Sequence, residues 1–104
     1  MDNCVRFTKD HIPAINSWYG LRAMPSVPEN LFPDIGFIVP GIGCGFLYKT
    51  DSALCFLDGY MANPNTTKEE RKDAFYAITR YLMRDAKDHG FTQILAYTKH
   101  QRRR

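Results

Sequence analysis

The chain has few cysteines and no long apolar run, and each absence excludes a class of protein. Its three cysteines are Cys4, Cys44 and Cys55, which lie in apolar, strand-like contexts without a CxxC pair. This pattern argues against a disulfide framework and a zinc site, and it favours a reducing compartment. No apolar run approaches about 18 residues, and the N-terminus lacks the basic start and apolar core of a signal peptide. The sequence therefore predicts a cytoplasmic protein without a membrane span.

The body of the chain also lacks an excess of positive or negative charge. The formal net charge is +3, and Arg102, Arg103 and Arg104 account for all of it. A near-neutral body does not indicate a nucleic-acid surface. The basic tail 101–104 is predicted to be a solvated end, with contact to an acidic partner or RNA as the alternative. The length of 104 residues predicts one domain over residues 1–104.

Five short apolar runs predict five strands. The first two are separated by a helical pattern over 11–22 and by a proline-rich loop over 24–34, which is long enough to line a site. Short turns join the second, third and fourth, which favours an antiparallel meander. The predicted strands are 4–7, 35–39, 42–49, 53–61 and 91–98.

The clearest helix is predicted over 68–89, between the fourth and fifth strands. It has one apolar stripe, and its start carries a capping box made by Thr66 with Glu69 or by Thr67 with Glu70. A strand, a crossover helix and another strand imply a right-handed parallel unit. The predicted fold class is therefore α+β, a mixed sheet with an antiparallel meander and one parallel β-α-β unit.

Side chains in these elements are expected to fill a core. Cys44 and Cys55 are predicted to pack as small hydrophobes on neighbouring strands. The aromatic residues predicted to build the core are Trp18, Phe37, Phe46, Phe56 and Phe75.

The turn over 63–71 has the expected geometry of an anion site. A strand that passes through a short turn into a capped helix presents unpaired amides and the positive end of the helix dipole. Thr66 and Thr67 are candidates to bind a diphosphate, or they only cap the helix, while Lys68 and Arg71 add positive charge. Glycine, which lets a backbone approach phosphate closely, is absent between Pro64 and His89. Glu69 and Glu70 lie in the same turn and repel phosphate.

The element order, together with segments 37–41, 46–52, 61–64 and 86–90, resembles small GNAT-type N-acetyltransferase-like proteins that phages often carry. The resemblance implies acetyl-CoA as cofactor, with its pantetheine arm on the fourth strand and its pyrophosphate on amides after Asn65. The basic residue and glycines of the family motif fall on Thr67, Lys68, Glu70 and Lys72, and none of them matches. The cofactor-binding residues implied are Met61, Ala62, Asn65, Thr66, Thr67, Lys68 and Arg71.

The resemblance also implies catalytic residues. Asp58 is the carboxylate inside the predicted fourth strand, where the family often places a general base, and burial would have to raise its pKa. The alternative is a solvent-facing or hydrogen-bonded strand residue. Tyr60, or Tyr97, is the candidate acid, although strand tyrosines more often belong to the core or its rim. No metal site is predicted.

The family continues past its fifth strand with a helix and two strands, whereas this chain stops at Arg104. Either a partner chain completes the sheet or the site is open, so homodimerisation through the open sheet edge is expected. Two functions follow from the resemblance. One is acetyl-CoA-dependent transfer of acetyl to an amine. The alternative is a non-catalytic GNAT-fold binding module, such as a phage factor acting on a host protein.

Overall fold

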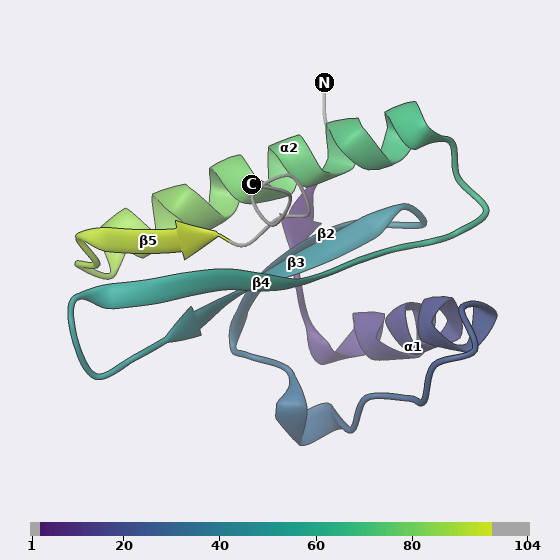
Figure 1. The fold of residues 1–104 in the computed structure, drawn as a ribbon, viewed down its shortest axis with the longest axis horizontal. Helices are drawn as coiled ribbons and strands as arrows, with labels where there is room; N and C mark the ends of the chain where they lie inside the picture. The colour runs from purple at the N-terminus through teal and green to yellow at the C-terminus, as the bar shows by residue number, and fades with distance from the viewer. Residues whose placement is uncertain (1–2, 97–104) are drawn as a thin grey trace, which may run out of the picture.

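The computed structural model of the chain describes residues 3–96, which form a five-stranded sheet with one α-helix on each face (Figure 1). The short 3-10 turn η1 directly precedes α1, and the short 3-10 turn η2 precedes β2. The elements are β1 (Val5–Arg6), η1 (Lys9–His11), α1 (Ile12–Leu21), η2 (Glu29–Leu31), β2 (Ile35–Val39), β3 (Gly43–Lys49), β4 (Leu54–Ala62), α2 (Lys68–Asp88) and β5 (Gln93–Ala96).

The strands lie in the order β1-β2-β3-β4-β5, and every pair is antiparallel except β4 with β5. The parallel pair is joined by α2, because strands that run the same way need a long crossover. The predicted α+β class, with an antiparallel meander and one parallel unit, is thereby confirmed. Residues 97–98 of the predicted last strand, Tyr97 and the basic tail 101–104 lie outside the described residues.

The start of α2 is fixed by one of the two predicted capping boxes. The Glu70 amide donates to Thr67 Oγ1 at 3.0 Å, and the Thr67 amide donates to Glu70 Oε1 at 2.8 Å. The other candidate cap, Thr66, instead donates its hydroxyl to the Asn63 carbonyl at 2.6 Å and so closes the turn before the helix. Thr67 and Glu70 therefore form the capping box, since the Thr66 hydroxyl already has a partner in the turn.

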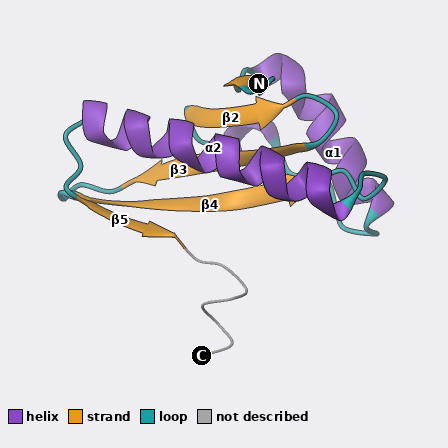
Figure 2. Ribbon diagram, turned by 90° about the horizontal axis from the view of Figure 1, so that it is seen from above, coloured by secondary structure: helices purple, strands orange, loops and turns teal. Residues whose placement is uncertain are grey.

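Each face of the sheet has its own apolar core, with α2 on one side and α1 on the other (Figure 2). Neighbouring β3 residues serve different cores because side chains alternate along a strand: Phe46 packs toward α1 and Leu47 toward α2. Cys44 and Cys55 are both fully buried, as predicted, on opposite faces. Phe56 was wrongly predicted to be core. It is 40% exposed, beside half-exposed Tyr48 on the part of the sheet beyond α1.

A bulge in β4 changes the direction of its side chains. Cys44 pairs with Met61 and Phe46 pairs with Asp58, so two β4 residues, Gly59 and Tyr60, oppose the single residue between the β3 pair. Gly59 has φ +72°, the left-handed conformation that a glycine adopts at low cost at the first position of such a bulge. Asp58 and Tyr60, which a regular strand would turn to one face, consequently lie on opposite faces.

Within residues 3–96, no helix has the length and apolarity needed to cross a bilayer.

Candidate functional site

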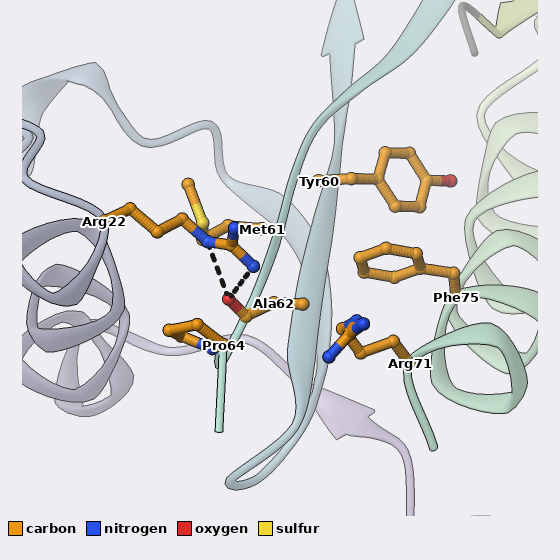
Figure 3. Close-up of a pocket in the computed structure, with 7 residues that line it drawn as sticks. All are labelled: Arg22, Tyr60, Met61, Ala62, Pro64, Arg71 and Phe75. Atoms are coloured by element: carbon orange, nitrogen blue, oxygen red, sulfur yellow. Dashed lines mark hydrogen bonds between the residues drawn. The ribbon is translucent and has the colours of Figure 1, made fainter. Parts of the chain in front are cut away.

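A pocket of about 480 Å³ lies along the edge of β4 that faces away from β3. The described pairing of β4 with β5 covers residues 54–57, so residues 58–62 have a strand neighbour on the β3 side alone within residues 3–96. The pocket extends around this edge, with α1 on one side and α2 on the other (Figure 3). Its lining residues are Arg22, Tyr60, Met61, Ala62, Pro64, Arg71 and Phe75.

Two arginines approach the pocket from opposite sides of β4 (Figure 3). The Asn63 amide donates to the Ile42 carbonyl at 2.8 Å, so the neighbouring Ala62 carbonyl points to the other edge of β4. Arg22, just after α1, donates to that carbonyl through Nε at 3.3 Å and Nη2 at 3.0 Å. Arg71, in the first turn of α2, donates from Nη1 to the Thr66 carbonyl.

Both guanidinium groups are therefore oriented by a backbone carbonyl and keep further N–H donors. Neither Arg22 nor Arg71 forms an ion pair with a carboxylate in the described part of the chain. An arrangement of two unpaired guanidinium groups beside a helix N-terminus is chemically suited to an anion with several oxygens, because each fork can donate two parallel hydrogen bonds.

The turn before α2 uses most of its own amides. Asn65 donates to Asn63 Oδ1 at 3.0 Å, Thr66 donates to the Asn63 carbonyl at 3.3 Å, and Thr67 donates to Glu70. Among the first residues of α2, the amides of Lys68 and Glu69 donate to no protein acceptor within residues 3–96. The predicted diphosphate turn therefore has two available amides, and the threonines Thr66 and Thr67 serve the turn and the cap.

No protein-family model matches the chain, and none of the curated proteins does.

The candidate acid Tyr60 is held on the α2 side of the pocket. Its hydroxyl hydrogen-bonds Thr79 Oγ1 at 2.6 Å, and its ring packs edge-on against Phe75 with centroids 5.3 Å apart. Burial raises the pKa of Tyr60 above its usual value, against the opposing effect of the Thr79 hydrogen bond. The phenol therefore keeps its proton at neutral pH and has one fixed partner.

The candidate base Asp58 lies on the other face of the sheet and is exposed. Its Oδ1 accepts a hydrogen bond from the Gly59 amide at 2.8 Å, which supports the bulge. The burial that the sequence argument required for a base is not present. The phenols of Tyr19 and Tyr48 belong to the same face, and their pKa values are raised first by burial and also by nearby charges that include Asp58.

The structure brings three of the predicted cofactor-binding residues into the pocket, namely Met61, Ala62 and Arg71. The candidate catalytic residues do not share a surface: Tyr60 lines the pocket, whereas Asp58 does not. Sequence reasoning missed Arg22, whose available signal was a basic residue at the end of a predicted helix. Within residues 3–96, no group of three or more His, Cys, Asp or Glu side chains is arranged to hold a metal ion.

Proposed function

We propose that this protein is GNAT-like and binds acetyl-CoA along the open edge of β4, with the pyrophosphate between Arg22 and Arg71. The observation that carries the proposal is the position of the two unpaired guanidinium groups, one on each side of the point where β4 passes into α2. The order of elements supports it too, since the crossover from β4 through α2 to β5 is where the resemblance expects the coenzyme.

The residues present fit a diphosphate in charge and donor type. Arg22 and Arg71 have spare N–H donors, and the Lys68 and Glu69 amides lie at the positive end of the α2 dipole. The carboxylates of Glu69 and Glu70 oppose an anion, but both side chains are exposed, and Glu70 is engaged in the capping box. Solvent screens the repulsion between these exposed carboxylates and a bound anion more strongly than it screens the attraction between the anion and a guanidinium group that contacts it.

When bound, acetyl-CoA supplies a thioester whose acetyl group passes to an amine, while the amine loses a proton and the coenzyme leaves as a thiol. Tyr60 lines the pocket and keeps its proton, with its hydroxyl turned toward Thr79 on α2, and it is the candidate to donate that proton to sulfur. The amine proton passes to Asp58 or to an ordered water, and Asp58 itself lies on the opposite face of the sheet and does not line the pocket.

Titration calorimetry with acetyl-CoA tests the binding proposal. We expect saturable binding in the range of about 1–100 µM. Substitutions Arg22→Ala and Arg71→Ala are each expected to weaken it about tenfold, since each removes charge-assisted hydrogen bonds. Lys49→Ala is the matched control, because it removes one positive charge at the exposed end of β3. Absence of heat at millimolar coenzyme would eliminate the proposal.

Inorganic pyrophosphate, used as a second probe, separates a coenzyme site from a simple anion site. We expect acetyl-CoA to bind at least about tenfold more tightly, because pantetheine adds contacts along β4. Equal affinities would assign the pocket to small anions and remove the coenzyme.

The catalytic assignment is tested by release of coenzyme thiol in the presence of primary amines. We expect Asp58→Asn to slow release while acetyl-CoA binding stays unchanged, because Asp58 does not line the pocket. A rate equal to that of the wild type would remove Asp58 as base.

The alternative is a non-catalytic binding module on the same scaffold, for instance a factor that acts on a host protein. The separation of Asp58 from Tyr60 by the bulge favours it, because no carboxylate lines the pocket within the described residues. Coenzyme binding without thiol release from any amine would support this alternative. Turnover would exclude it.

A further inference from the structure

The outer face of α2 carries a stripe of exposed side chains that the pocket does not use. Most of its members are three or four residues apart and therefore lie on one side of the helix. Two of them are large and apolar or aromatic: Tyr76 is 69% exposed and Met83 is 45% exposed. Within residues 3–96, no helix or strand covers this side of α2, which is turned away from the sheet (Figures 1 and 2). The stripe consists of Glu69, Asp73, Tyr76, Arg80, Met83, Arg84 and Lys87.

Charge along the stripe is segregated. Its first half carries Glu69 and Asp73 with the single cation Lys72 at its side, and its second half carries Arg80, Arg84 and Lys87. The helix dipole accounts for this order of signs. It does not account for the exposed tyrosine and methionine in the middle.

The two arginines of the stripe have no carboxylate partner, because Arg80 and Arg84 form no ion pair within residues 3–96. Each lies over an aromatic ring instead. The Arg80 Cζ is 5.9 Å from the ring centroid of Tyr76, and the Arg84 Cζ is 5.1 Å from that of Tyr81. Stacking limits the conformations of both guanidinium groups, so less entropy is lost when a partner binds them.

We propose that this stripe docks on the same stripe of a second copy of the chain, with the two α2 helices antiparallel about a twofold axis near residue 78. An isologous interface requires a self-complementary surface. The segregated charges meet that requirement: Glu69 faces the partner's Lys87, and Asp73 faces the partner's Arg84. At the centre, Tyr76 faces the partner's Arg80.

The composition of the stripe favours a protein over a nucleic acid. Tyrosine, methionine and arginine are enriched in the centres of protein interfaces. Two carboxylates in the same stripe would repel a phosphate backbone. A cavity of about 420 Å³ beside the stripe, with an apolar floor that includes Ile42 and Ala77, gives a large side chain of the opposing helix a place to pack.

Sedimentation equilibrium between about 10 µM and 1 mM tests the proposal through a charge swap. We expect reversible dimers for the wild type and a dimer dissociation constant raised about tenfold or more by Asp73→Arg or Arg84→Asp. Symmetry doubles each effect, because either change turns two attractive pairs into two repulsive ones. The double variant Asp73→Arg/Arg84→Asp restores the pairs and is expected to dimerise again.

A mixture of the two single variants gives the sharpest result. The arginine introduced at position 73 of one variant then meets the aspartate introduced at position 84 of the other. The second pair keeps its native Arg84 and Asp73, so we expect heterodimers from two proteins that are monomeric alone. Asp51→Arg, with the same charge change in the exposed β3–β4 turn, is the control and should dimerise like the wild type. Far-UV circular dichroism checks that every variant is folded.

Two results would overturn the proposal. One is a wild type that stays monomeric up to about 1 mM, the upper end of the range in which such dimers would be detected. The other is a dimer that both single variants leave unchanged, which would assign self-association to another surface such as the β5 edge predicted from the sequence.

Discussion

At the scale of single residues, Gly59 determines how the candidate site is divided between the two faces of the sheet. Its positive φ allows the bulge, and the bulge turns Asp58 and Tyr60 apart. The space around it is also closed to a side chain. A Cβ at this position would lie 2.9 Å from the Tyr48 hydroxyl and 3.1 Å from Phe46 Cδ2. The positive φ therefore favours glycine, and a methyl group would in addition crowd Phe46 and displace the end of the partly exposed Tyr48 side chain.

Gly59→Ala is accordingly expected to lower the free energy of unfolding by about 2–4 kcal/mol, combining backbone strain with overpacking. Urea denaturation measures the loss. The matched control is Gly20→Ala on α1, where a Cβ meets no atom within 4 Å. That change should stabilise the protein by about 0.5–1 kcal/mol, because alanine favours a helix. A Gly59→Ala protein as stable as the wild type would contradict the bulge.

The bulge and its effect on side-chain direction could be predicted from the sequence only in part. A glycine inside a strand signals a bulge in general terms. The alternation rule nevertheless places Asp58 and Tyr60 on one face, because the extra residue becomes apparent only when β4 is paired with β3. A strand without the bulge would have brought the candidate base and the candidate acid to the same face.

At the scale of elements, α2 is joined to the edge strand β1 by an ion pair with unequal burial. Arg6 Nη1 donates to Asp85 Oδ2 at 2.8 Å, and the guanidinium lies 4.8 Å from the Phe37 ring centroid. The Asp85 side chain is only 10% exposed, whereas that of Arg6 is 57% exposed. Removal of Arg6 thus leaves a nearly buried carboxylate unpaired, whereas removal of Asp85 leaves an exposed guanidinium unpaired.

We expect Arg6→Met to cost about 1–3 kcal/mol of unfolding free energy, because a nearly buried carboxylate loses its partner. Asp85→Ala should cost less than about 1 kcal/mol, since an exposed guanidinium returns to water. In urea denaturation, the double variant should resemble Asp85→Ala alone. The opposite order, with Asp85→Ala the more damaging, would show that packing and not the buried charge determines the cost.

Most elements could be predicted from the sequence because their signals are local. Periodicity located α1, β2 and α2, with start and end errors of about one residue, and short turns gave the antiparallel meander. The ion pair could not be predicted, since Arg6 and Asp85 are 79 positions apart. Arg22 at the pocket was missed for the same reason. Its partner carbonyl at Ala62 is on β4, and only the docking of α1 brings the two together.

At the scale of the whole molecule, one sheet supports two cores, and this arrangement predicts a single unfolding transition. The β3 strand contributes Phe46 to the α1 side and Leu47 to the α2 side, so neither core survives loss of the strand. Trp18, the one tryptophan of the chain, lies on α1 and is 3% exposed. Its fluorescence therefore reports on the core on the α1 side. Far-UV circular dichroism reports mainly on α2, the longest helix among the described residues.

We therefore expect urea curves from Trp18 fluorescence and from circular dichroism to coincide. Ile15→Ala on the α1 side and Ile78→Ala on the α2 side remove fully buried side chains. Each should shift both curves by the same free energy, about 2–4 kcal/mol. A fluorescence transition that precedes the dichroism transition would mean that α1 undocks alone. Because α1 carries Arg22 to the β4 edge, such undocking would also open one wall of the pocket before the sheet unfolds. The acetyl-CoA binding proposed above would then fail in Ile15→Ala at urea concentrations that Ile78→Ala tolerates.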